Sequence, residues 1–119
     1  MHDSAYRFVA ENLPPLAGLS VLEAGSYNEN GSLRDLFSEA KSYVGIDIRE
    51  GPGVDVACDA EEADSLGKFD VVVSVNTLEH AENWITALYG LMVATKKGGL
   101  LLLSAPGPGY PRHDHPGDY

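Results

Sequence analysis

Residues 19–31 read Leu-Ser-Val-Leu-Glu-Ala-Gly-Ser-Tyr-Asn-Glu-Asn-Gly, and this stretch decides the fold. A short apolar run ends at Glu23 and passes into a loop bounded by Gly25 and Gly31. Ser32 follows, with Asp35 three residues later, which is a capping-box pattern for the start of a helix. Strand, glycine loop and helix in this order are typical of a site for a nucleotide-like ligand in an open α/β sheet. Glycine lets the backbone approach the ligand, and the helix start presents free N–H groups.

The loop differs from the fingerprint of dinucleotide-binding folds, which requires glycine at three fixed places. Here only Gly25 and Gly31 flank residues 26–30. Glu23 stands two residues before the first glycine, where a carboxylate suits a ligand with an ammonium group better than one with a pyrophosphate. S-adenosylmethionine carries such an ammonium group. Taken alone, the loop leaves open a strand-to-helix turn that binds nothing.

Composition limits the function classes. The chain has 119 residues, enough for one domain, and a formal net charge of −10 with only 8 Lys and Arg. This balance argues against a nucleic-acid surface. Cys58 is the single cysteine, so no intramolecular disulfide is expected, and we predict a buried thiol. The start of the chain carries no signal pattern, and the longest apolar run, 100–103, is too short to cross a bilayer, so we expect a cytoplasmic protein without membrane contact.

Apolar spacing and turn residues predict strands that alternate with helices. The valines of the fourth strand indicate burial on both faces. The predicted helices cover 3–13, 32–40 and 81–97, with a short polar helix or turn at 61–66, and the predicted strands cover 19–23, 42–47, 54–58, 69–74 and 100–104. In the last helix we expect one apolar face and a cationic C-terminus, formed by Trp84, Leu88, Leu91, Met92 and by Lys96 and Lys97.

This alternation predicts an α/β fold with a Rossmann-like open, mainly parallel five-stranded sheet and helices on both faces. We expect one domain over 1–119, with an N-terminal helix and turn over 1–18 and an irregular tail over 105–119. Three strands end at acids, namely Glu23, Asp47 and Asp59. Because parallel strands end at one edge, these acids together with the glycine loop favour a nucleoside site over acids that merely cap strands on a solvated rim.

Four runs of sequence carry a resemblance to a known family. Residues 21–25, 43–47, 69–80 and 97–102 resemble class I S-adenosylmethionine-dependent methyltransferases, most closely the small-molecule group called type 11. Phe-Asp-Val-Val-Val-Ser followed by Leu-Glu-His is the most specific block. The likeness covers nearly all of the chain from Leu19, and residues 106–119 resemble a loop that follows the fifth strand in some members.

The resemblance implies a cofactor site for S-adenosylmethionine. Glu23 and the Gly25 loop would hold the methionine part, Asp47 would accept from the ribose hydroxyls, and Ile48 would pack on the adenine. Asp59 and the backbone of Ala60 would read the adenine edge. The implied cofactor-binding residues are Glu23, Gly25, Asn30, Gly31, Asp47, Ile48, Asp59, Ala60 and Asn76.

For chemistry, the resemblance directs attention to the Leu-Glu-His block. Methyl transfer is a displacement at a sulfonium that needs positioning and often a general base. His80 is the candidate base, although a histidine that caps the next helix or packs on the cofactor is an equal alternative. Glu79, His113 and His115 are candidate substrate contacts. His113 and His115 have no evident third ligand, so we predict no metal site.

The chain departs from the family pattern in two places. Tyr27 and Glu29 stand where the family usually has glycine, which makes the loop bulkier. The family also continues through two further strands beyond the fifth, so we expect a C-terminally shortened fold whose exposed fifth-strand edge pairs two copies in a homodimer. The predicted function is methyl transfer to an O, N or C atom of a small molecule. The alternatives are a catalytically inactive nucleoside-binding or assembly module and a nicotinamide-binding Rossmann domain.

Overall fold

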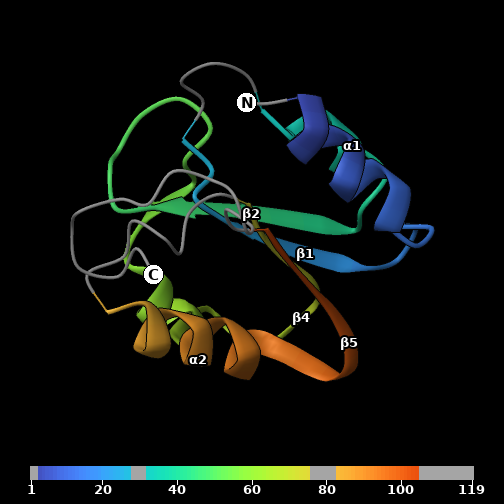
Figure 1. The fold of residues 1–119 in the computed structure, drawn as a ribbon. Helices are drawn as coiled ribbons and strands as arrows, with labels where there is room; N and C mark the ends of the chain where they lie inside the picture. The colour runs from blue at the N-terminus through green and yellow to red at the C-terminus, as the bar shows by residue number, and fades with distance from the viewer. Residues whose placement is uncertain (1–2, 28–31, 76–82, 105–119) are drawn as a thin grey trace, which may run out of the picture.

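The computed structural model describes residues 3–27, 32–75 and 83–104. The elements are α1 (Asp3–Asn12), β1 (Ser20–Ala24), the 3₁₀ helix η1 (Arg34–Phe37), β2 (Ser42–Asp47), β3 (Val56–Ala57), the 3₁₀ helix η2 (Ala60–Leu66), β4 (Phe69–Val75), α2 (Trp84–Ala94) and β5 (Thr95–Ser104). The five strands form one parallel sheet in the order β3-β2-β1-β4-β5. Figure 1 shows α1 on one side of this sheet and α2 on the other. The predicted fold class is confirmed.

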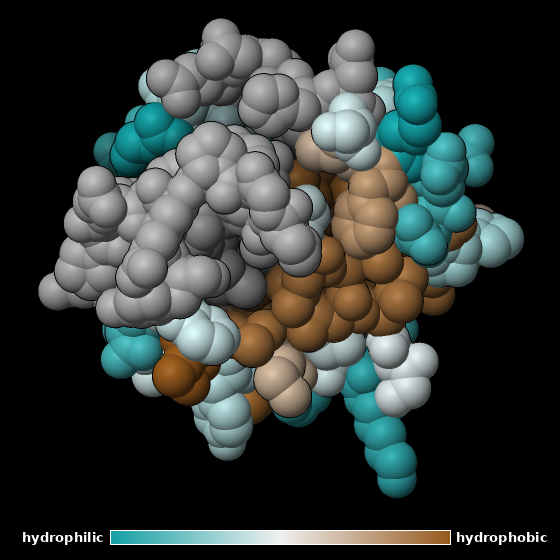
Figure 2. Space-filling model, viewed as in Figure 1, coloured by the Kyte–Doolittle hydropathy of each residue, from teal (hydrophilic) through white to brown (hydrophobic). Residues whose placement is uncertain are grey.

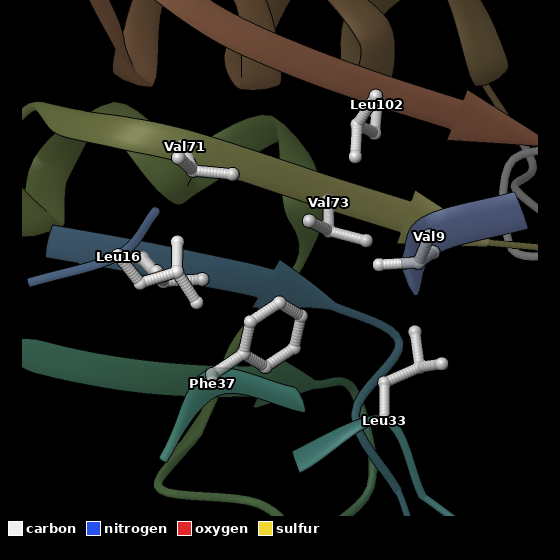
Figure 3. Packing of buried hydrophobic residues seen from close by; sticks show 8 residues of the cluster. Val9, Leu16, Leu33, Phe37, Val71, Val73 and Leu102 are labelled. Atoms are coloured by element: carbon white, nitrogen blue, oxygen red, sulfur yellow. The ribbon is translucent and has the colours of Figure 1, made fainter. Parts of the chain in front are cut away.

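The core consists of two apolar layers, one on each face of the sheet. On the first face, side chains from α1 and η1 pack against β4 and β5, as Figure 3 shows for Val9, Phe37, Val73 and their neighbours. On the second face, η2 and α2 cover β1, β2 and β4. Val71, Val72 and Val73 alternate between the two layers and are all buried, as predicted for the fourth strand. A strand buried on both faces anchors the centre of the sheet.

A polar lock fixes the register of β1 against β4 at their amino ends. The backbone N–H and the hydroxyl of Ser20 both donate to Asp70 Oδ2, at 2.9 and 3.1 Å, and the Asp70 N–H donates back to Ser20 Oγ at 3.1 Å. The backbone N–H of Ser20 is the main reason why the pKa of Asp70 lies below its ordinary value. Because register decides which side chains leave the carboxyl ends together, this lock also aligns the opposite edge.

The predicted helix over 32–40 was wrong in length and type. Only η1 forms, and Ser32 Oγ accepts from the Arg34 N–H at 3.0 Å without completing the capping box with Asp35. The Lys41 N–H donates to Leu19 O at 2.8 Å, which ties the chain back to the start of β1 directly after η1. Since the chain must enter β2 at Ser42, no room is left for further turns.

The predicted helix over 81–97 corresponds to the shorter α2. Asn83 Oδ1 accepts from the Thr86 N–H at 3.2 Å at its start, and β5 follows directly at Thr95, so that Lys96 and Lys97 lie in the strand. The predicted apolar face is confirmed for Leu91, which is buried, but was wrong for Trp84 and Met92. Trp84 and Met92 are 36% and 55% exposed, whereas the buried residues are Ala87, Gly90, Leu91 and Ala94. Small side chains face inward because the backbone of η2 lies close to Gly90.

The outer strands also differ from the predictions in extent. β3 is shorter than predicted, whereas β5 starts five residues earlier and shifts register, with Phe69 opposite Thr95 and Val71 opposite Leu100. Within the described ranges β5 forms one edge of the sheet. Figure 2 shows apolar surface over this strand between α1 and α2. The homodimer through this edge stays a prediction. Cys58 is half-buried, so the prediction of a buried thiol was wrong.

The contact of α2 with η2 generates a stability prediction at Gly90. A Cβ at this position would lie 2.5 Å from Ala60 O and 2.8 Å from the Glu61 Cα, both of which are backbone atoms. Gly90→Ala gains about 1 kcal/mol of helix propensity, yet we expect a net loss of about 1–3 kcal/mol from the forced shift. Urea unfolding measures the change.

Ile85→Ala on the exposed face of α2 is the matched control, because Ile85 is 64% exposed. We expect this control to change the free energy of unfolding by less than about 0.5 kcal/mol. A Gly90→Ala variant more stable than the wild type would show that α2 and η2 are not held at this distance.

Candidate functional site

The candidate site lies at the carboxyl edge of the sheet, where the strand order reverses. From β1 the chain moves to β2 and β3 on one side, and then to β4 and β5 on the other. In open α/β sheets such a reversal leaves a crevice beyond the strand ends, because the connections on its two sides diverge. The register places Glu23 opposite Gly45 and Val73, near the ends of the two central strands and β2.

Glu23 is the buried acid of this edge. Its side chain accepts a hydrogen bond from Tyr43 Oη at 2.6 Å, and only 4% of the residue is exposed. Within the described ranges, no lysine or arginine forms an ion pair with Glu23. Burial raises the pKa of Glu23 from 4.5 to about 7, although the Tyr43 hydrogen bond and the charge of Arg34 act in the opposite direction. A buried carboxyl group in this state favours the neutral form until a cation approaches it.

The glycine turn after β1 packs closely on β2. Gly25 has a φ of 83°, a conformation that favours glycine, and the N–H groups of Gly25 and Ser26 donate to Ile46 O at 2.8 and 3.0 Å. A Cβ on Gly45 would lie 2.6 Å from Ser26 Oγ and 2.7 Å from Gly53 O. Gly45 therefore lets the turns after β1 and β2 meet at the same edge.

Asp47 ends β2 beside this turn. Its carboxylate accepts from the Tyr27 N–H at 3.3 Å, from the Arg49 N–H at 3.0 Å and from Arg49 Nε at 3.4 Å. Two carboxylate oxygens offer about four acceptor positions, so Asp47 keeps capacity for another donor. The next residue, Ile48, is an apolar side chain that is 75% exposed at the strand end.

Tyr27, which departs from the family pattern, turns its ring toward the loop after β2. The Arg49 guanidinium lies 4.0 Å from the ring centroid, and a Cβ on Gly51 would lie 2.5 Å from Tyr27 Cε2. The loop after β2 thus has a glycine where the ring approaches its backbone. The ring of Tyr27 is accommodated by its contacts with Arg49 and Gly51 in the loop after β2.

The third acid, Asp59, follows β3 and begins η2. Its Oδ1 accepts from the Glu61 N–H at 3.1 Å, so this carboxylate acts as the N-cap of η2, and Ala60 is the first residue of that helix. The Cys58 N–H donates to Asp47 O at 2.9 Å, which places the segment before Asp59 beside the end of β2. The structure therefore brings Glu23, Asp47 and Asp59 to one edge, as the sequence predicts.

Other predicted site residues lie outside the described residues and stay predictions. They are Asn30, Gly31, Asn76, Glu79, His80, His113 and His115.

Sequence reasoning missed two buried serines near this edge, Ser26 and Ser74. Among the residues that the structure describes, neither hydroxyl group has a hydrogen-bond partner, and Ser74 lies opposite Ala24 near the end of β4. A serine directly after a run of three valines, near the end of a strand, is the signal that could have identified Ser74.

Comparison with known proteins decides the family. The profile of a family described as a methyltransferase domain matches residues 1–117, nearly the whole chain. The chain belongs to this family. It is a class I methyltransferase domain, which agrees with the resemblance carried by the strand-end motifs. A comparison with curated proteins finds no significant match.

Among solved structures, this methyltransferase domain is similar in fold to the selenomethionine-substituted CurJ carbon methyltransferase. The TM-score is 0.55 at 21% sequence identity, and the match covers 78% of this chain. The chain corresponds to only 30% of the length of that structure. In the described part of the domain, no helix combines the length and apolar character needed to span a membrane.

The raised pKa of Glu23 predicts how the stability of the domain depends on pH. The folded chain holds the Glu23 proton more tightly than the unfolded chain, so this contribution to stability is complete below pH 4.5 and is lost as the pH rises to about 7. Glu23→Gln should remove it. As the pH rises from 4.5 to 7.5, we expect the free energy of unfolding of the variant to increase by up to about 3 kcal/mol relative to that of the wild type, as measured by denaturant unfolding.

Glu11→Gln on the exposed surface of α1 controls for the loss of one carboxyl group. If the unfolding free energies of Glu23→Gln and the wild type run parallel across this pH range, the Glu23 carboxyl is not buried as the structure describes.

Proposed function

We propose that this domain binds S-adenosylmethionine at the carboxyl edge of β1 and β2 and transfers its methyl group to an O, N or C atom of a small molecule. Membership of the methyltransferase family supports methyl transfer in general. The choice of cofactor rests on the chemistry of the edge residues.

The observation that carries this proposal is the Glu23 carboxyl group, buried beside the glycine turn with a tyrosine hydroxyl as partner and no ion pair among the described residues. A buried carboxylate is costly unless a cation or several hydrogen bonds compensate it. The ammonium group of S-adenosylmethionine supplies that cation. The pyrophosphate of a nicotinamide dinucleotide would bring negative charge to the same place.

The last residue of β2 and the residue after it fit the nucleoside part of the same ligand. Asp47 has spare acceptor capacity for ribose hydroxyls, which are donors, and Ile48 offers an exposed apolar surface for a flat base. Asp47 Oδ2 and the turn after β1 are joined by the Tyr27 N–H at 3.3 Å. The groups proposed for the ribose and for the amino acid are therefore held in one connected edge.

When bound, S-adenosylmethionine supplies an electrophilic methyl group on its sulfonium. The work assigned to this chain is to bind and orient: Glu23 would hold the amino group and Asp47 would hold the ribose hydroxyls. Fixed positioning of this kind lowers the barrier of a displacement reaction without covalent catalysis. His80 as general base and Glu79, His113 and His115 as substrate contacts complete the proposal.

Calorimetric titration with S-adenosylhomocysteine, the demethylated product, tests the cofactor site. We expect the wild type to bind, and we expect Asp47→Ala to weaken binding by about 1 kcal/mol or more, because donors of the ligand lose a partly buried acceptor. Asp64→Ala is the matched control, since Asp64 is exposed on η2. This control should bind as the wild type does.

A folded wild type that binds no S-adenosylhomocysteine would contradict the proposal. Binding without methyl transfer to any acceptor in a small-molecule screen would instead favour the inactive nucleoside-binding module.

A further inference from the structure

Tyr43 joins the buried acid of β1 to the segment that follows the glycine loop. Its hydroxyl donates to Glu23 Oε1 at 2.6 Å, and this is the side-chain hydrogen bond that Glu23 makes among the described residues. Its ring stacks on Phe37 of η1, with centroids 5.4 Å apart and planes inclined by 22°. Contacts with β1 and η1 therefore hold the Tyr43 side chain, and the direction of its hydroxyl group is fixed.

A charged pair completes the enclosure of Tyr43. The Arg34 guanidinium lies 4.6 Å from the centroid of the Tyr43 ring, and Arg34 Nη2 forms an ion pair with Asp55 Oδ1 at 3.2 Å. Asp55 Oδ2 in turn accepts from the Gly45 N–H at 2.8 Å, and Gly45 is the register partner of Glu23. The contacts run from β1 through β2 and η1 and return to β2 beside the starting residue.

In this network Arg34 and Asp55 form an ion pair, whereas Glu23 has a neutral partner. Arg34 forms its ion pair with Asp55, which is a partner other than Glu23. Glu23 receives a neutral hydroxyl at Oε1, and within the described ranges no protein donor contacts its second oxygen. A carboxylate fixed at one oxygen and open at the other is arranged to accept from a ligand.

We propose that Tyr43 is a positioning residue that orients the Glu23 carboxylate toward the amino group of the bound cofactor. This inference rests on the proposed function, because it concerns how that site recognises the amino-acid part of its ligand. Tyr43 fixes one carboxylate oxygen, and Phe37 and Arg34 fix Tyr43. This preorganisation increases the binding affinity, since a preorganised acceptor loses less conformational freedom when the ligand binds.

Tyr43→Phe separates this role from a purely structural one, because the variant keeps the ring and removes only the hydroxyl. Two ligands are compared by calorimetry. S-adenosylhomocysteine carries the amino-acid chain on its sulfur. In 5′-methylthioadenosine the adenosine and the sulfur are the same, but a methyl group replaces the amino-acid chain. We expect Tyr43→Phe to weaken the first by about five- to tenfold and to leave the second unchanged.

The matched control is Tyr89→Phe, which removes the same hydroxyl from an exposed position on α2. This control should bind both ligands as the wild type does. In a Glu23→Gln background, Tyr43→Phe should cause little further loss, because the group that it positions has changed. Thermal unfolding of each variant checks that the fold is kept.

A second readout needs no ligand. The Tyr43 hydrogen bond lowers the pKa of Glu23, and the charge of Arg34 acts in the same direction against the burial of the carboxyl. Loss of the hydroxyl should therefore raise the pKa of Glu23. The titration is measured by the ¹³C chemical shift of the Glu23 carboxyl carbon. An unchanged titration would overturn the role of Tyr43 whatever the cofactor is.

The binding outcomes are distinct. If Tyr43→Phe weakens both ligands equally, or weakens neither, Tyr43 is not the positioning residue, while the cofactor site itself stands. If the wild type binds neither ligand, the proposed function is overturned and this role of Tyr43 with it.

Discussion

A carboxyl group buried at the end of a central strand is the constraint on which the rest of this site depends. Glu23 is covered by protein and receives a tyrosine hydroxyl, but the described residues supply no ion-pair partner. In a stable apolar core such a group is a cost, because its charged form is poorly solvated. At a binding site the same group favours ligand binding, because a cationic group of the ligand compensates the desolvation of the carboxylate.

The scaffold keeps this arrangement in place from the opposite side. Buried valines of β4 tie both apolar layers together, and the Ser20–Asp70 lock fixes the register between β1 and β4. Gly45 lets the turn after β1 approach the turn after β2, so the edge residues come from a few short, connected segments. Their positions follow from strand register more than from long loops.

Much of this edge could be predicted from the sequence, because parallel strands must end together and Glu23, Asp47 and Asp59 each follow an apolar run. The length of α2 and its buried face could not, since Gly90 turns inward only where the backbone of η2 approaches it. The network around Tyr43 was equally hidden. Its members, Arg34, Tyr43 and Asp55, lie far apart in the sequence, and no local pattern connects them.

Amide chemical-shift mapping with S-adenosylhomocysteine tests the central claim most directly, because it reports where a ligand binds. We expect the largest shifts on the turn at Gly25–Tyr27 and at the carboxyl end of β2, from Asp47 to Arg49. We expect Ile85 and Tyr89, on the outer face of α2, to keep their positions in the spectrum. Shifts gathered on α2, or none at saturating ligand, would contradict a cofactor site at the carboxyl edge of β1 and β2.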